Sequence, residues 1–205
     1  MRHTILAVDP GLRAVGVAVL APNGVLRHIA VLTSSDGEDT PRRVRAITAH
    51  VAELLRLYRP HVVVLEEVWR TQNRSLAPVR RVADAIGRQA RARRIAVVEI
   101  PAGTVRRQLL GYGRAGKRDV AGAVIARYPE LRVYAGTRRT WRERHFEHLF
   151  DAVAVGLAYR ETPPNSPSPS SRTRAVPCRR RAGAARNAQG SRRLSGEFTT
   201  DRHAT

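Results

Sequence analysis

The most constraining feature of the sequence is an aspartate that lies between two apolar runs near the N-terminus. Four apolar residues precede Asp9, a Pro-Gly pair follows it, and residues 14–20 form a second apolar run. Continuous apolar runs of this length are typical of buried strands, and Pro-Gly favours a turn. A carboxylate at the tip of a buried strand is unfavourable unless a neighbouring charge compensates it. The sequence therefore predicts a hairpin, with strands at 4–9 and 14–20, that carries Asp9 into a functional site.

The chain is strongly basic. Its formal net charge is +20, from 37 basic and 17 acidic residues. Residues 161–205 contain nine Arg and three acidic residues, so residues 1–160 hold 28 basic and 14 acidic residues and a net charge of +14. Because the excess is not confined to the C-terminal part, we expect the folded part itself to bind a polyanion, with a salt-dependent affinity.

Composition also predicts the domain organisation. After about residue 160 a Pro- and Ser-rich stretch leads into Arg, Ala, Gly and Ser with few apolar residues. Such a segment cannot form regular helix or sheet or bury a core. We expect one folded domain at 1–160 and a disordered basic tail at 161–205, which either adds non-specific nucleic-acid affinity or is inert.

Other classes of protein are disfavoured. No stretch approaches the ~20 apolar residues of a membrane span, and the first apolar run, which ends at Asp9, lacks a signal-peptide pattern. The single cysteine, Cys178, excludes an intramolecular disulfide and suits a reducing compartment. No Cys/His cluster has zinc-site spacing. We expect a cytoplasmic protein without a membrane partner.

Hydrophobic periodicity predicts an α/β domain. Thr40 and Pro41 provide a cap and a first helical residue for the first helix. The predicted strands are 4–9, 14–20, 25–33, 62–65 and 95–100, and the later helices are 76–93, 102–110, 117–127 and 147–159. The first three strands should form an antiparallel meander, to which two parallel strands are added. Residues 131–146 fit either an extra DNA contact or a loop before the last helix.

Three further potential ligands occupy suggestive positions. Glu66 ends the predicted strand 62–65, while His148 and Asp151 are three residues apart and so share one helical face. Oxygen-rich sets of this kind hold Mg²⁺ or Mn²⁺. Lys117 is the only lysine among the 37 basic residues. An ammonium differs from a guanidinium in geometry and hydration, so this lysine is either functional or a chance survivor.

Four motifs in order resemble one known family. They are Asp-Pro-Gly within residues 5–13, a strand-end Glu before an aromatic residue and an Asn within 64–73, a basic Gly-x-Gly-x-Ala-x-Lys segment within 105–117, and ligands three apart within 148–154. Together they resemble the RuvC Holliday junction resolvases over about residues 4–159. The resemblance implies an RNase H-like α/β fold, with a five-stranded mixed sheet of three antiparallel and two parallel strands flanked by helices.

The resemblance also implies phosphodiester hydrolysis by a two-metal mechanism. The two Mg²⁺ or Mn²⁺ ions of each active site would be held by Asp9, Glu66, His148 and Asp151. Glu67 and Glu147 are reserve ligands if the register differs. The family more often has Asp at position 148. Because transition metals accept imidazole more readily than Mg²⁺ does, we expect a preference for Mn²⁺. The alternative for His148 is an exposed helix histidine.

Several residues match DNA-contacting positions of the family. Lys117 would approach the scissile phosphate and stabilise developing charge, and Arg106 would clamp a phosphate. Trp69 would stack on a base at the opened junction centre, or it is a core tryptophan. The remaining candidates for backbone or base contacts, each with an ordinary solvated role as the alternative, are Arg70, Asn73 and Arg114.

The implied function is resolution of four-way DNA junctions by symmetric paired nicks in recombination and repair. Because symmetric cutting requires two active sites, we expect a homodimer, with the helix at 76–93 as its contact surface because that helix has an apolar and an Arg-rich face. The resemblance further implies cooperation with the RuvA and RuvB branch-migration proteins. The alternatives are another RNase H-like nuclease, acting on RNA or branched DNA, and a non-catalytic DNA-binding protein.

Overall fold

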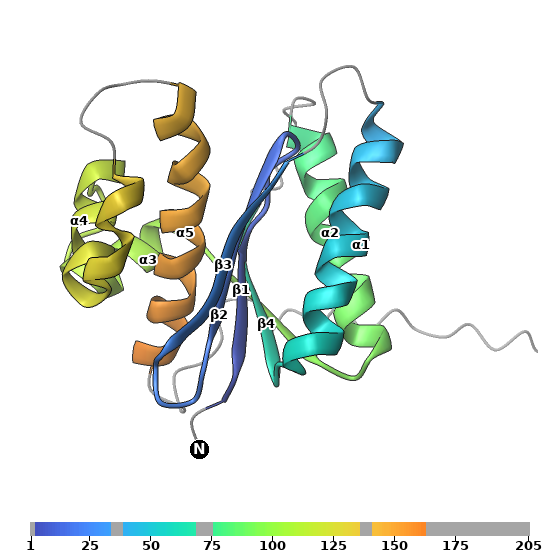
Figure 1. Ribbon diagram of the computed structural model, residues 1–205, viewed down its shortest axis with the longest axis horizontal. Coiled ribbons are helices and arrows are strands. Elements are labelled where there is room, and N and C mark those ends of the chain that lie inside the picture. The colour runs from blue at the N-terminus through green and yellow to red at the C-terminus, as the bar shows by residue number, and fades with distance from the viewer. Residues whose placement is uncertain (1–2, 34–38, 69–75, 136–140, 163–205) are drawn as a thin grey trace, which may run out of the picture. The chain divides into compact units, whose positions relative to one another are not determined.

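A five-stranded mixed sheet lies at the centre of the structure, with helices on both faces (Figure 1). The computed structural model describes residues 3–33, 39–68, 76–135 and 141–162, without the side chains of 141–145. All described residues belong to one unit. The strands are β1 (Ile5–Asp9), β2 (Ala14–Leu20), β3 (Leu26–Thr33), β4 (Val62–Glu66) and β5 (Ala96–Ile100). The helices are α1 (Thr40–Tyr58), α2 (Ala77–Ala92), α3 (Ala102–Leu110), α4 (Lys117–Arg127) and α5 (Trp141–Glu161), with a 3-10 helix at Pro129–Tyr134.

The strand order β3-β2-β1-β4-β5 places β1 at the centre. β1 pairs antiparallel with β2, and β2 with β3, whereas β4 is parallel to both β1 and β5. This confirms the predicted mixed sheet. In the parallel register Val8 lies beside Leu65, so the next residues, Asp9 and Glu66, end neighbouring strands at the same edge of the sheet.

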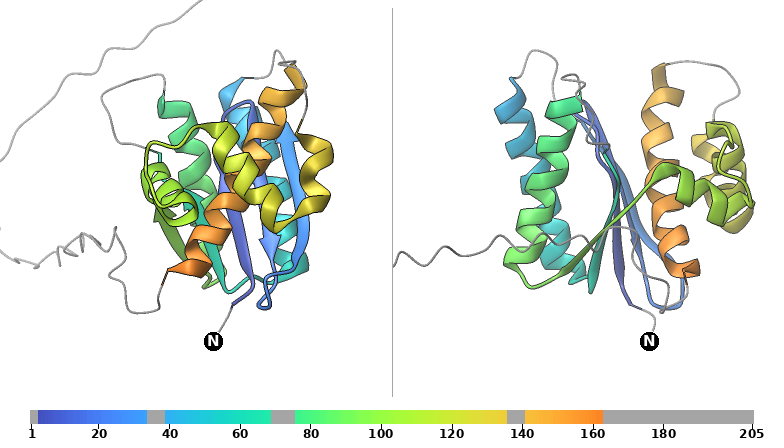
Figure 2. Two further views of the ribbon diagram at one scale, coloured as in Figure 1. Left: turned by 90° about the vertical axis from the view of Figure 1, so that its left-hand side faces the viewer. Right: turned by 180° about the vertical axis from the view of Figure 1, so that it is seen from behind.

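Two cores follow from the alternation of side chains along the strands. Ile5 and Ala7 of β1 face the core that α3, α4 and α5 cover, and Leu6 and Val8 face the core that α1 and α2 cover. Figure 2 shows the two helical layers on opposite sides of the sheet. β2 is buried along its whole length, which explains why it appears in the sequence as a continuous apolar run rather than an alternating one.

Some boundaries differ from the predicted ones. The side chain that caps α1 is Asp39, which accepts a hydrogen bond from the Arg42 backbone N–H at 2.8 Å, and Thr40 is already helical. Asp is among the strongest N-cap residues, so the cap lies one residue earlier than predicted. The last helix begins at Trp141 instead of 147 and reaches Glu161, so part of the segment 131–146 is helical and leads directly into the site.

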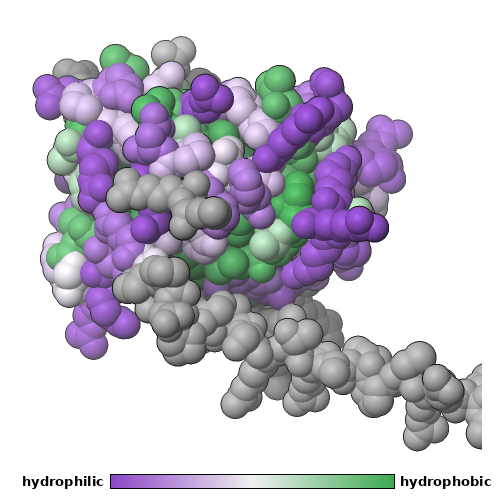
Figure 3. Space-filling view, turned by 90° about the horizontal axis from the view of Figure 1, so that it is seen from below, coloured by the Kyte–Doolittle hydropathy of each residue, from purple (hydrophilic) through white to green (hydrophobic). Residues whose placement is uncertain are grey.

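The outer surface is mainly hydrophilic. Figure 3 views the described surface from the end where the chain enters β1, and long hydrophilic side chains project from it with smaller hydrophobic areas between them. Within the described helices, none combines the length and the apolar character that a membrane crossing requires.

Candidate functional site

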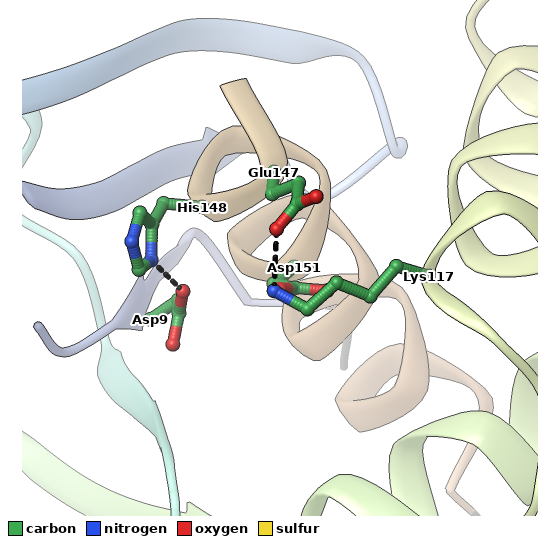
Figure 4. A network of polar contacts seen from close by, with 5 residues as sticks. All are labelled: Asp9, Lys117, Glu147, His148 and Asp151. Atoms are coloured by element: carbon green, nitrogen blue, oxygen red, sulfur yellow. Dashed lines mark hydrogen bonds and ion pairs between the residues drawn. The ribbon is translucent and has the colours of Figure 1, made fainter. Parts of the chain in front are cut away.

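Asp9 and His148 form the centre of the candidate site. Asp9 ends β1, and His148 lies on α5, whose backbone crosses the neighbouring strand. Nδ1 of His148 is 2.6 Å from Oδ2 of Asp9 (Figure 4), and the two side chains are 31% and 13% exposed. The hydrogen bond to Asp9 raises the pKa of His148 although partial burial opposes it. The protonated imidazole is thereby favoured, and in that form it would compensate the charge of the strand-end carboxylate.

A glycine allows α5 to approach this closely. Gly16 is the register partner of Asp9 on β2, and a Cβ built on it would lie 1.8 Å from the backbone oxygen of His148. Further along the helix, a Cβ on Gly156 would lie 2.6 Å from Leu20. The missing side chains let the helix backbone lie against the sheet, and the contact at Gly16 fixes the height at which His148 meets Asp9.

Glu66 brings a second carboxylate to the same edge. Burial, followed by the negative charges of Asp9 and Asp151, raises the pKa of Glu66 to about 8, against the opposing charges of Arg106 and Lys117. Glu66 and Asp9 line one pocket, whose other walls are Pro10, Glu67, Val68 and Leu76. Glu66 is thus electrostatically coupled to the other carboxylates, and Glu67 lines the same pocket.

Asp151 supplies the third carboxylate. It lies on α5, one turn beyond His148, and its side chain is 21% exposed. Burial, together with the charge of Asp9, raises the pKa of Asp151 to about 6, although Lys117, His148 and Arg106 oppose the shift. Carboxylates that raise one another's pKa lie close enough to repel, and a bound cation would relieve that repulsion.

Lys117 reaches this cluster from another element. It is the first residue of α4, after a segment in which Gly111 has φ +83 and so adopts a conformation that favours glycine. Its Nζ lies 2.8 Å from Oε2 of Glu147 and 3.7 Å from Oδ2 of Asp151. Figure 4 shows the side chain extended across to α5. Partial burial lowers the pKa of Lys117, but the hydrogen bond to Glu147 and the nearby carboxylates outweigh this effect and raise it. The lysine is therefore charged.

The predicted DNA-contacting residues divide into two groups. Arg106 is half-buried on α3, and its charge acts on Glu66 and Asp151, whereas Arg114 is exposed in the segment before α4. Trp69, Arg70 and Asn73 lie outside the described residues.

One residue near the site was not singled out from the sequence: Arg80, which belongs to the Arg-rich face predicted for the helix at 76–93. Its side chain is only 19% exposed, and its guanidinium donates to the backbone oxygen of Val68 at 2.8 Å. It also pairs with Asp84 at 3.2 Å and with Glu99 at 3.4 Å. Arg80 thereby holds the chain where it leaves β4 after Glu66. Only the three-dimensional path of residue 68 reveals this, since helical periodicity alone places Arg80 with its exposed neighbours.

The site fits a divalent cation in the chemistry of its donors. Within the described ranges, no three His, Cys, Asp or Glu side chains stand close enough together to hold an ion. Two of the carboxylates lie instead beside nitrogen groups of the protein: Asp9 is 2.6 Å from Nδ1 of His148, and Asp151 is 3.7 Å from Nζ of Lys117. Carboxylate oxygens that repel one another and one imidazole are nevertheless suitable ligands for Mg²⁺ or Mn²⁺.

Comparisons with known proteins identify the family of the chain. The family model described as crossover junction endodeoxyribonuclease RuvC matches residues 5–132. The crossover junction endodeoxyribonuclease RuvC of Acidiphilium cryptum is 34% identical over 125 residues, covering 59% of this chain and 75% of its own. The RuvC of Thermus thermophilus is 31% identical over 164 residues, which cover 76% of this chain and 92% of the Thermus protein.

A solved structure shows the same arrangement. Thermus thermophilus RuvC in complex with a Holliday junction substrate matches with a TM-score of 0.60 and 26% identity, over 77% of this chain and 92% of that one. The predicted RNase H-like fold is confirmed by this likeness together with the strand order. The matched family, the extent of the alignment and the shared fold agree, and the chain belongs to the RuvC family of crossover junction endodeoxyribonucleases.

Proposed function

We propose that this protein resolves Holliday junctions by metal-dependent hydrolysis of phosphodiester bonds in two opposed strands. The observation that carries the proposal is the convergence of Asp9, Glu66 and Asp151 at one edge of the sheet, beneath a charged lysine. A binding protein gains nothing from buried carboxylates that repel phosphate, whereas a hydrolase can use them to hold cations. Membership of a nuclease family supports the same reading.

The RuvC family consists of divalent-metal-dependent nucleases. In this chain we assign the ligands to Asp9, Glu66, His148 and Asp151, for two ions per site. Bound divalent ions activate water and neutralise charge on both oxygens of an in-line displacement. Because Nδ1 of His148 lies 2.6 Å from Asp9, that contact must yield when both side chains turn to a metal.

The remaining residues act on the substrate. We assign Lys117 to the scissile phosphate, where its ammonium would stabilise developing negative charge, and Arg106 to an adjacent phosphate. A guanidinium is suited to bidentate contacts with phosphate oxygens rather than to proton transfer, so the role assigned to Arg106 is to clamp a phosphate. Arg114 and, outside the described residues, Trp69, Arg70 and Asn73 remain proposed DNA contacts.

We assign a homodimer because a two-fold junction requires two sites in two-fold relation. The apolar stripe of α2 that first suggested a contact surface is largely used within the chain, since Val82, Ile86 and Ala90 pack in the core beneath α1 and α2. The exposed side of α2 carries Arg81, Arg88 and Arg91. The argument for a dimer therefore comes from the two-fold symmetry of the junction and not from the surface of α2. We further propose that the protein cooperates with RuvA and RuvB and is located in the cytoplasm. Its folded domain would span 1–160, followed by a tail at 161–205.

The metal preference is a separate proposal. Imidazole at position 148 should favour Mn²⁺ over Mg²⁺, because transition metals bind nitrogen ligands more readily. Cleavage rates measured across titrations of both metals, for wild type and His148→Asp, test this. We expect higher activity with Mn²⁺ in wild type and a smaller difference in the variant. Equal activity of wild type with both metals would contradict it.

The function itself is tested by nicking of a synthetic four-way junction with a short mobile core. Wild type and Asp9→Asn are compared on the junction, on linear duplex of matching sequence and on RNA–DNA hybrid. Symmetric paired cuts in the junction alone, lost in Asp9→Asn, are expected. Preferred cutting of the hybrid would instead indicate another RNase H-like nuclease, and junction binding without cutting under either metal would indicate a non-catalytic recogniser.

A further inference from the structure

Glu147, like Glu67, is an acidic residue at the site that the ligand assignment does not use. It directly precedes His148 on α5 and lies one turn before Asp151. Its Oε2 accepts a hydrogen bond from Nζ of Lys117 at 2.8 Å. In Figure 4 the Glu147 carboxylate and Asp151 lie on the same side of α5, and the end of the Lys117 side chain lies between them and α4.

This ion pair is poorly placed to stabilise the fold. The side chain of Lys117 is 52% exposed and that of Glu147 is 38% exposed, and exposed ion pairs contribute little to stability. Its effect is instead on the lysine, whose long side chain loses considerable rotamer freedom when it is fixed. Glu147 restrains that side chain before any substrate is present.

The distances also determine what the ammonium can still do. An ammonium has three N–H donors. One is used by Glu147 at 2.8 Å, and Asp151 at 3.7 Å lies beyond a normal hydrogen bond. Glu147 thus keeps the ammonium beside Asp151 without a close contact, leaving that carboxylate less engaged and at least one donor free for a phosphate oxygen.

We propose that Glu147 is a positioning residue for Lys117. Its carboxylate holds the ammonium beside the carboxylate cluster, where the ammonium can contact the scissile phosphate. The inference rests on the proposed function, in which Lys117 contacts that phosphate. It takes the place of the reserve role of Glu147 as a metal ligand, because the four assigned ligands already complete the set and Oε2 of Glu147 accepts a hydrogen bond from the lysine.

The first test separates turnover from binding. Glu147→Gln keeps the size of the side chain and an acceptor oxygen but removes the charge. We expect turnover at saturating junction to fall about fivefold, the factor that corresponds to the loss of one exposed ion pair. Junction affinity without metal should not fall, because a negative charge near the phosphates has been removed. Glu53→Gln removes one charge from the exposed face of α1 and serves as the matched control.

A double-mutant cycle distinguishes positioning from ligation. In a Lys117→Ala background, Glu147→Gln should have no further effect on turnover, because the group it positions is gone. A drop that persists in that background, and that higher metal concentration relieves, would make Glu147 a ligand and overturn the proposal. Turnover of Glu147→Gln equal to wild type would overturn it as well.

A second readout needs neither DNA nor metal. Because Lys117 is the only lysine in the chain, lysine-selective ¹³C labelling of the full-length protein gives a single ε-methylene NMR signal. We expect greater mobility of this methylene in Glu147→Gln than in wild type or Glu53→Gln. Equal mobility in all three would refute the contact. If wild type cuts no junction, the proposed function fails, and this measurement still decides whether Glu147 holds Lys117.

Discussion

At the scale of single residues, the site balances charge with the protein's own groups. Asp9 has the His148 imidazole 2.6 Å away, and Asp151 has the Lys117 ammonium 3.7 Å away. Glu66, which has no such close cation among the residues that the structure describes, has its pKa raised to about 8 by burial and by the two neighbouring carboxylates. The least compensated carboxylate is therefore the one that most strongly retains its proton, and this has a measurable consequence for stability.

We predict that the metal-free protein loses stability as pH rises from about 4.5 to 8. The native pKa values of Glu66 and Asp151 are about 8 and about 6, above their usual 4.5 and 3.8, and that of His148 is also raised. In this window the native state binds more protons than the unfolded state, so stability is highest at the acidic end and falls as these protons leave. Glu66→Gln removes the largest of these shifts and should flatten the dependence.

The measurement is thermal unfolding at pH 5.5 and pH 8 with a chelator present. For a protein of this size 1 kcal/mol corresponds to ~2–4 °C in Tm, so the difference between wild type and variant should be several degrees at pH 8. Glu53→Gln, exposed on α1, should keep the wild-type dependence. An identical pH dependence for Glu66→Gln and wild type would contradict the assigned coupling.

At the scale of the elements, the site depends on how closely α5 lies against the sheet. We predict that Gly16→Ala destabilises the protein and abolishes cleavage. The new Cβ would be 1.8 Å from the His148 backbone oxygen, so the helix must move away, and His148 and Asp151 with it. Overpacking of this kind costs about 1–3 kcal/mol. Urea unfolding and junction cleavage are the measurements.

Gly122 offers the matched control for that substitution. It lies in the interior of α4, exposed, and a Cβ added to it would have no atom within 4 Å. Gly122→Ala should therefore stabilise the protein by ~0.5–1 kcal/mol, because alanine is the better helix former. Gly16→Ala with wild-type stability and cleavage would show that the close approach of α5 to β2 is not required.

The elements also show what the sequence could and could not predict. Continuous apolar runs and alternation were sufficient for all five strands, and the strand-end positions of Asp9 and Glu66 followed from them. The contacts of Arg80 and Glu147 were not predictable, because each joins elements distant in sequence, such as Lys117 and Glu147, 30 residues apart. The early start of α5 was missed because Arg and His residues at 142–145 mask its periodicity.

At the scale of the whole molecule, an acidic site is set in a basic protein. Residues 1–160 carry a net charge of +14, so phosphate is attracted over the molecule and repelled only where carboxylates gather. The positive charge around the site attracts DNA to the protein. The ion pair between Lys117 and Glu147 is half-exposed and therefore weak, so the lysine can leave it to contact a phosphate. The proposed cutting of two opposed strands adds a second such site, on a partner subunit.

We predict that a heterodimer of wild type and Asp9→Asn nicks only one strand of a junction. Each subunit would supply one complete set of ligands, so loss of Asp9 in one subunit removes one cut and leaves the other. Differently tagged subunits allow the heterodimer to be purified, and a supercoiled plasmid with an extruded cruciform provides the readout, because paired cuts linearise it and a single nick relaxes it. Wild-type homodimers should give linear DNA, heterodimers nicked circles and mutant homodimers neither. Linear product from heterodimers at the wild-type yield, or a chain that remains monomeric while it cuts, would show that the two strands are not cut by two subunits.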